Sequence, residues 1–266
     1  TKANNYLPYK AVLWRPENMG VPKNQITGWL YTNRIQFYEL WKAVKGKRVF
    51  VSTSNPDIQV QAFLDEKKLY VALNNLDDAA QQVALDISSI KSNVSDLFVK
   101  SLTVYSDDFP RYYEQTIGTI PDIFSIDPAE TIVLEFNLKN SIKFNNKIKS
   151  SRYYTNNYLL PIEAQKELVF EFNEVQLGVG FAKLSMSIGR GHDLSKTPEV
   201  FVNDNKVEVP LNWKGYDQAN RKKFFGAIEI PVPMELIKQN NSVRVTFPDT
   251  GGHLSSLILN VEIIIN

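Results

Sequence analysis

The chain contains no cysteine and only two histidines among its 266 residues. Without cysteine it has no disulfides, thiolate metal sites or thiol redox chemistry, and this absence is neutral on compartment. Its 30 basic and 29 acidic residues give a net charge of +1, which does not indicate a nucleic-acid partner. No apolar run reaches the roughly 18 residues of a membrane span, which argues against a membrane partner. The first ten residues lack the form of a signal peptide, so we expect a mature or internal segment.

One long helix is predicted, at residues 34–45, and it leads directly into the β domain that follows. Asn33 can cap this helix, no Gly or Pro interrupts it, and Gly46 can supply the left-handed residue that ends it. The apolar positions form two faces, one with Phe37, Leu40, Trp41 and Val44 and the other with Ile35, Tyr38 and Ala43. We expect one face to pack on the β domain that follows. The other face must meet residues outside the chain, since only about thirty residues precede the helix.

A short apolar run before this helix, residues 11–14, is followed at once by Arg15, Pro16 and Glu17. This pattern predicts a buried strand that ends in a polar loop, because Pro16 cannot continue a central ladder. Strand, loop and helix make half of a β/α repeat. If it is the last repeat of a (β/α)8 barrel, the loop lies on the face where barrel enzymes keep their active sites.

From Arg48 the apolar period changes to two, which predicts antiparallel β structure. We predict strands at 48–52, 58–64, 69–73, 82–87, 97–105 and 131–136. A polar stretch at 140–152 reads as a linker. Beyond it we predict strands at 168–172, 181–188, 199–202, 206–209, 225–230, 242–247 and 254–265, with one short helix after Pro233. The fold class is therefore mainly β: two antiparallel, jelly-roll-like sandwiches at 47–138 and 139–266, preceded by a barrel segment at 1–46.

Carboxylates, which act in pairs in glycoside hydrolysis, offer no complete active site here. Glu17, Glu130 and Glu163 could each sit at a strand end, but no two of them share a motif. Glu17 has the best position, after the predicted barrel strand. We therefore assign no catalytic residue.

The two histidines, His192 and His253, both lie beside glycines and so in loops or turns. A two-histidine metal site would require these loops to meet, and solvated loop side chains are the more common case. Asp193 and Ser195 lie close to His192, but a catalytic triad is recognised by geometry and not by sequence proximity. We predict no metal site and no cofactor.

Aromatic residues give the strongest binding signal, because tryptophan rings stack on sugar faces. Trp14, at the end of the predicted strand, is open to both sugar contact and core packing, whereas packing is favoured for Trp29 and Trp41. A sugar platform on the second sandwich is a further alternative, although edge packing is favoured over it. Its residues would be Tyr153, Tyr154, Tyr158, Trp213 and Tyr216.

Three stretches, taken in order, carry a family resemblance: LWRPE at 13–17, TGWLYTNRIQFYELWKAVKGKRV at 27–49, and NPDIQVQAF with KKLYVALNNL within 55–76. Together they resemble the C-terminal part of glycoside hydrolase family 86, the β-agarases and β-porphyranases. The match is most specific across 27–76, while LSMSIGRG at 184–191 and PEVFVN at 198–203 fit more loosely.

The resemblance implies a catalytic (β/α)8 barrel followed by two β-sandwiches, and retaining endo-hydrolysis of a red-algal galactan by two barrel glutamates. Those glutamates would precede residue 1, so none is carried over. Trp14, Arg15 and Glu17 correspond to the last barrel strand and its loop, which implies a substrate-binding role. Agarose and porphyran both stay open as substrates.

Two functions follow from these observations. In the first, the chain is the C-terminal portion of a galactan hydrolase, secreted, periplasmic or on the surface of a bacterium, whose sandwiches support an upstream barrel. In the second, it is an autonomous carbohydrate-binding or structural module without catalysis. The presence or absence of an upstream barrel distinguishes the two.

We predict that the purified 266-residue chain does not hydrolyse agar or porphyran, because general-acid catalysis needs a positioned pair of carboxyl groups. A reducing-sugar assay checks this. Sugar release that is abolished by Glu17→Gln would show the prediction to be wrong.

Overall fold

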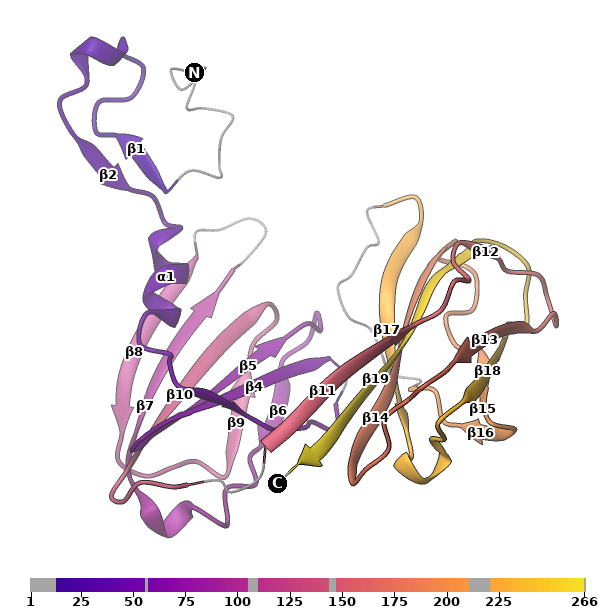
Figure 1. The fold of residues 1–266 in the computed structure, drawn as a ribbon. Helices are drawn as coiled ribbons and strands as arrows, with labels where there is room; N and C mark the ends of the chain where they lie inside the picture. The colour runs from indigo at the N-terminus through magenta and orange to yellow at the C-terminus, as the bar shows by residue number, and fades with distance from the viewer. Residues whose placement is uncertain (1–12, 56, 105–109, 144–146, 211–220, 266) are drawn as a thin grey trace. The chain divides into compact units, whose positions relative to one another are not determined.

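The computed structural model describes residues 13–55, 57–104, 110–143, 147–210 and 221–265 (Figure 1). Two compact units are present. The first unit holds residues 1–53 and 58–142, and the second holds 54–57 and 143–266. Helix is a small part of the described chain, as predicted, and no helix in it is long and apolar enough to cross a membrane.

The first unit is built on a six-stranded antiparallel sheet. Its strands run in the order β3 (Lys47–Val49), β4 (Ile58–Asp65), β5 (Lys68–Asn75), β10 (Glu130–Leu138), β7 (Val94–Thr103) and β8 (Arg111–Ile117). A two-stranded sheet, β6 (Gln81–Ala84) with β9 (Ile123–Ile126), and a 3-10 turn at Lys91–Asn93 complete the sandwich. Ahead of it come β1 (Trp14–Pro16), a 3-10 turn at Lys23–Gln25, β2 (Trp29–Tyr31) and α1 (Ile35–Trp41).

Both faces of the six-stranded sheet are covered. The main core lies between this sheet and the β6–β9 pair, with Leu97, Ile126, Leu134 and Phe136 at its centre, each fully buried. On the opposite face Ala72, Leu102 and Val133 are buried together with Leu40 of α1. The alternation predicted for 58–64 is present, since Ile58 and Ala62 are buried while Gln59 and Gln61 are exposed.

The helix differs from its prediction in length and in capping. It covers Ile35–Trp41 rather than 34–45, and its N-cap is Arg34, in helical conformation without a side-chain cap. Asn33 therefore does not cap the helix, because the chain enters through a backbone turn in which Asn33 O accepts from Gln36 N. Gly46 does adopt a left-handed conformation, with φ of +104°, and a Cβ there would lie 2.3 Å from Leu64 O. Its place is the turn into β3, after the helix has ended.

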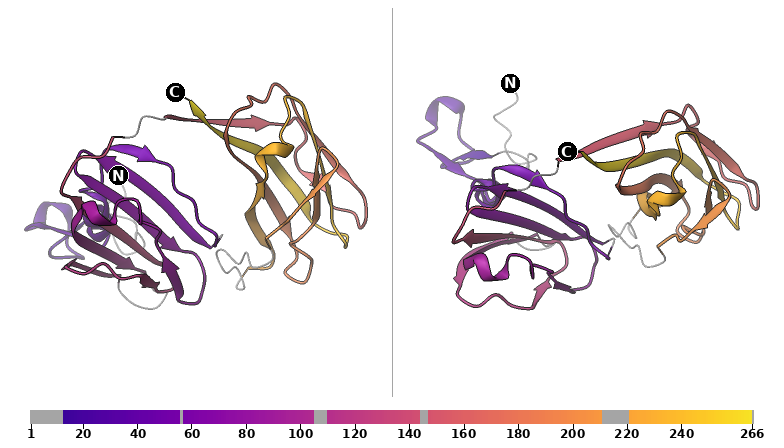
Figure 2. Two further views of the ribbon diagram at one scale, coloured as in Figure 1. Left: turned by 90° about the horizontal axis from the view of Figure 1, so that it is seen from below. Right: turned by 60° about the horizontal axis from the view of Figure 1, so that its bottom comes forward.

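The second unit is a sandwich of two antiparallel sheets (Figures 1 and 2). One runs β11 (Lys147–Tyr154), β19 (His253–Ile265), β14 (Gly180–Arg190) and β17 (Phe224–Val232), with β12 (Leu160–Pro161) also paired to β19. The other runs β13 (Leu168–Phe172), β18 (Asn241–Thr246), β15 (Glu199–Val202) and β16 (Asn205–Val207). The helix predicted after Pro233 is a 3-10 turn at Met234–Leu236.

Five strands were missing from the sequence prediction, and each is short or strongly exposed. The largest correction concerns the predicted linker at 140–152, which contains most of β11, an edge strand paired along its whole length with β19. Its Lys and Ser residues are mostly exposed, so its composition resembles that of a linker. The others are β2, β8, β9 and β12.

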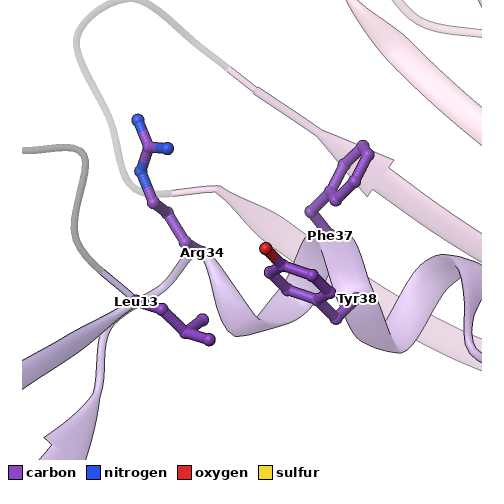
Figure 3. A pocket seen from close by; sticks show the side chains of 4 residues that line it. All are labelled: Leu13, Arg34, Phe37 and Tyr38. Atoms are coloured by element: carbon purple, nitrogen blue, oxygen red, sulfur yellow. The ribbon is translucent and has the colours of Figure 1, made fainter.

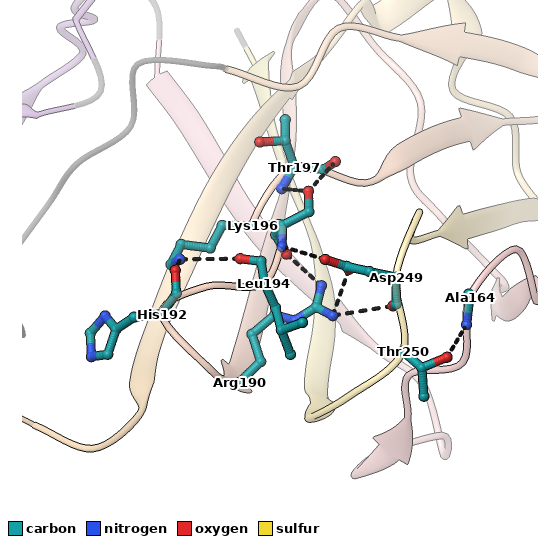
Figure 4. A network of polar contacts seen from close by, with 9 residues as sticks. Ala164, Arg190, His192, Leu194, Lys196, Thr197, Asp249 and Thr250 are labelled. Carbon is teal, nitrogen blue, oxygen red and sulfur yellow. Dashed lines mark hydrogen bonds and ion pairs between the residues drawn. The ribbon is translucent and has the colours of Figure 1, made fainter.

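A buried arginine ties together the loops at one end of the second sandwich (Figure 4). The Arg190 side chain is fully buried, and its Nη2 donates to Asp249 Oδ1 at 2.8 Å and to Asp249 O at 3.2 Å. Its Nη1 donates to Ser195 O, and the guanidinium lies 4.7 Å from the centre of the Phe247 ring. Asp249 also accepts from Ser195 N at 2.8 Å, and this bond, with the Arg190 charge, holds the pKa of the Asp249 carboxyl below its usual value.

We predict that Asp249→Asn lowers the free energy of unfolding of the second unit by about 2–3 kcal/mol, because it leaves a buried guanidinium without its counter-charge. The low pKa of Asp249 means that its contribution is complete above the unfolded pKa, near pH 4, and is lost as the pH falls below it. The difference in unfolding free energy between wild type and variant should therefore become smaller below about pH 4. Hydrogen exchange of the β14 and β19 amides, measured at increasing urea concentration, gives the unfolding free energy of the second unit.

Asp204→Asn is the matched control, because Asp204 pairs with Arg244 at the surface. Its effect should stay within about 0.5 kcal/mol. Equal losses for the two variants would contradict a special role for the Arg190 contact.

Candidate functional site

The candidate site begins with a small antiparallel hairpin, β1 with β2. Its register pairs Trp14 with Tyr31 and Pro16 with Trp29. The loop between the strands is pinned by Asn18, whose Nδ2 donates to Gln25 O at 2.8 Å and whose Oδ1 accepts from Thr27 N at 3.1 Å. The predicted strand–loop–helix order is thus corrected: a second strand precedes the helix, and the first strand pairs with it.

One face of this hairpin is aromatic. Directly paired residues share a face, so Trp14, Pro16, Trp29 and Tyr31 lie on the same side. The rings of Trp14 and Tyr31 are 3.8 Å apart between centres and tilted by 33°. Trp14 is 44% exposed and Trp29 and Tyr31 are each 50% exposed, so the predicted burial of Trp14 is wrong, while residues 11 and 12 of the predicted strand lie outside the described residues. Exposed aromatic side chains of this kind can stack on sugars.

Arg15 and Glu17 take different positions. Arg15 is half-buried and pairs with Leu30, which places it on the hairpin face opposite Trp14. Glu17 is exposed at the start of the loop, where its N donates to Gly28 O at 2.9 Å. Its carboxylate lies over Gly28, since a Cβ there would be 2.7 Å from Glu17 Oε2. The three predicted substrate-binding residues are therefore neighbours in the hairpin but do not share one face.

A cavity of about 330 Å³ lies where the hairpin meets α1 (Figure 3). Leu13 lines it from the start of the hairpin, and Arg34, Phe37 and Tyr38 line it from the start of the helix. Its volume is at the lower end of the range for ligand pockets. No sequence pattern marked this cavity, because it depends on how the hairpin turns into the helix.

The helix presents its two faces differently from the prediction. Leu40 is fully buried against the sheet, and Trp41 and Val44 pack beside it. Phe37, predicted on the same stripe, is 56% exposed, as is Tyr38. Phe37 and Tyr38 lie in the first turns of α1, where they line the cavity beside the hairpin. Exposed aromatic surface is therefore concentrated at the helix start.

The other carboxylates considered have structural or surface roles. Glu130 is buried, and its side chain accepts from Asp127 N at 2.7 Å and from the Ser101 hydroxyl. Glu163 is exposed and pairs with Lys166. Glu130 begins β10, in the six-stranded sheet, and Glu163 belongs to the second unit.

The histidine region forms part of the Arg190 network (Figure 4). His192 Nε2 lies 3.0 Å from Arg221 O, and the Ser195 hydroxyl donates to Thr197 O at 3.2 Å, so both side chains are engaged with backbone carbonyls and not with each other. Across the ranges that the structure describes, no three His, Cys, Asp or Glu side chains gather in a way that could hold a metal ion.

The aromatic residues of the second sandwich divide into two groups. Tyr153 is half-buried against the core, and its hydroxyl accepts from Gln176 N at 2.8 Å. Tyr154 and Tyr158 are 65% and 68% exposed. Trp213 and Tyr216 lie outside the described residues.

Two family models match the chain. The model described as porphyranase β-sandwich domain 1 matches residues 57–160, and the model described as β-porphyranase A C-terminal matches residues 169–262. Together they take in most of both sandwiches.

Known relatives extend this similarity to the hairpin and the helix. The chain is 47% identical over 263 residues to β-porphyranase A of Phocaeicola plebeius, covering 98% of this chain and 36% of that protein. It is 38% identical over 258 residues to a funoran endo-β-hydrolase of Wenyingzhuangia aestuarii, covering 96% and 35%. A solved β-porphyranase of glycoside hydrolase family 86 from Bacteroides plebeius superposes with a TM-score of 0.88 at 46% identity, covering 100% of this chain and 46% of that one. The chain thus spans about a third of the length of these curated relatives.

We predict that the amides of residues 37–44 exchange faster with solvent than those of 58–73 in the purified chain. A seven-residue helix is unstable alone, and only Leu40 of α1 is fully buried. Hydrogen exchange with mass spectrometry measures this. Equal protection in both segments would contradict the prediction and favour an autonomous module.

Proposed function

The chain belongs to glycoside hydrolase family 86, whose C-terminal part it matches, and on this premise we propose that it is the C-terminal portion of a retaining endo-hydrolase of red-algal galactans. The observation that carries the proposal is the 47% identity to β-porphyranase A over 98% of the chain. Porphyran is therefore the first substrate to test, with agarose and funoran next.

Catalysis in this proposal belongs to an upstream (β/α)8 barrel. Retaining glycoside hydrolysis needs an acid and a nucleophile whose carboxyl groups are about 5 Å apart. That pair is assigned to the barrel, because Glu130 and Glu163 are engaged elsewhere in this chain. Residues 1–46 are assigned to the last barrel segment, and the two sandwiches support the barrel.

The exposed aromatic residues at the start of α1 support an upstream partner. Phe37 and Tyr38 are 56% exposed, and clustered exposed aromatics usually mark an interaction surface. Covering apolar surface contributes roughly 25 cal/mol per Å², so a contact of a few hundred Å² stabilises the pair by several kcal/mol. Such a contact holds the barrel and the first sandwich together.

Trp14 provides the substrate contact in this proposal, with Arg15 and Glu17 beside it. Its ring is half-exposed and supported from one side by Tyr31, so the open side is available to a sugar face. Arg15, on the opposite hairpin face, and Glu17, in the loop, contribute polar groups at the edge of the site. The chain needs no cofactor for this role.

We place the protein outside the bacterial cytoplasm, secreted, periplasmic or on the cell surface. The reason is the size of the substrate, because a galactan polymer must be cut before it can enter a cell.

A second candidate function is an autonomous carbohydrate-binding module. Tyr154 and Tyr158 favour it, because both are about two-thirds exposed on the second sandwich, where exposed tyrosines can stack on sugars. In that case binding depends on these tyrosines and not on Trp14.

A chimera tests the proposal. Joining this chain to the part of Phocaeicola plebeius β-porphyranase A that lies outside their match should give an enzyme that releases reducing sugar from porphyran. The 47% identity makes the contact surfaces compatible. That part of β-porphyranase A alone is the control, and we expect it to be inactive or insoluble. A soluble chimera without activity would contradict the proposal.

Within the chimera, Trp14→Ala should raise KM for porphyran about tenfold, as expected for loss of one aromatic stacking contact of roughly 1.4 kcal/mol. Tyr154→Ala is the matched control, since Tyr154 is also exposed, and it should leave KM unchanged. The reverse result would support the carbohydrate-binding alternative.

A further inference from the structure

The helix α1 lacks the features that stabilise a short helix from within. It has seven residues, no side-chain N-cap, no acidic residue in its first turn and no basic residue in its last turn. Isolated helices of this length do not persist in water. Its stability must therefore come from the sheet on which it lies.

The apolar contact with that sheet is small. Leu40 is the one residue of α1 that is fully buried, and it meets Ala72, Leu102 and Val133. Apolar packing is non-directional, so a contact of this size fixes the position of the helix but constrains its rotation only weakly.

A buried lysine supplies a directional contact. Lys100 is only 5% exposed, although lysine is rarely buried without a partner. It lies on β7 in register with Val133, which in turn pairs with Ala72, so all three side chains face α1. Its Nζ donates to the backbone O of Glu39 at 3.0 Å.

Glu39 O belongs to the last turn of α1, where backbone carbonyls have no partner within the helix. A cation at this end also interacts favourably with the helix dipole. Lys100 thus acts as a C-terminal cap that the sheet provides to the helix.

A short turn joins the hairpin to the start of α1. Thr32 N donates to Leu13 O at 2.8 Å, and Ile35 N donates to Thr32 O at 3.0 Å. Thr32 is therefore bonded to the hairpin on one side and to the helix on the other. A rotation of α1 would carry Trp14 with it.

We infer that Lys100 is a positioning residue: by capping α1 from the sheet it fixes the orientation of the hairpin that bears Trp14. This inference rests on the proposed function for its effect on substrate. The contact itself depends only on the fold of the first unit.

Hydrogen exchange on the full 266-residue chain tests the contact. Lys100→Met keeps the apolar stem and removes the donor, and it should speed exchange of the 35–41 amides about tenfold while β4 and β5 amides are unchanged. Lys100→Arg keeps a cationic donor and should restore most of the protection. The matched control is Lys68→Met, since Lys68 lies at the start of β5 in the same sheet and pairs with Glu135 instead of the helix. Unchanged exchange in Lys100→Met, or an equal rise in Lys68→Met, would overturn the inference.

Kinetics of the chimera distinguish two roles for Lys100: fixing the orientation of the Trp14 hairpin, or only stabilising the fold. Lys100→Met should raise KM for porphyran roughly three- to tenfold, with kcat nearly unchanged and with recovery in Lys100→Arg. A lower melting temperature with unchanged KM would show a structural role only and overturn the inference. An inactive wild-type chimera would contradict the proposed function, while the exchange result would still decide the role of Lys100.

Discussion

The central strands of the first sheet carry buried apolar side chains on both faces, and this constraint determines where α1 can lie. In β10, Leu134 and Phe136 point into the main core while Val133 points to the other side, and all three are buried. Leaving that second face in water would expose apolar surface at roughly 25 cal/mol per Å². The helix covers it, so the position of α1 follows from the composition of β5, β10 and β7.

This arrangement also explains how the sheet can carry a buried lysine. Lys100 lies in the same cross-strand row as Ala72 and Val133, where an unpaired ammonium would be costly. The end of α1 offers a carbonyl oxygen at the right place, so the charge and the unpaired helix end satisfy each other. Apolar burial brings the helix to the sheet, and the hydrogen bond selects one orientation of it.

The sequence predicted strands well where burial alternates regularly and poorly where it does not. β13 and β15 match their predicted bounds because Leu168, Phe170 and Phe172, or Val200 and Val202, alternate with exposed residues. β11 and β8 were missed because they are edge strands with mostly exposed side chains, which read as linker or loop. The helix was predicted too long because Asn33 and Gly46 are suitable capping residues, yet the chain uses backbone turns at both ends.

For the candidate site, the sequence indicated the residue types but not their geometry. Trp14 was identified from its place after an apolar run, whereas its stacking on Tyr31 depends on a strand pairing that joins residues 17 positions apart. A two-stranded hairpin of this size is marginal alone, so the ring stack, the Asn18 loop bonds and the Thr32 link to α1 all help to hold it. Trp14 takes part in this support through its contact with Tyr31 and is still 44% exposed within the described structure, so the hairpin holds its aromatic residues at the surface rather than in a core.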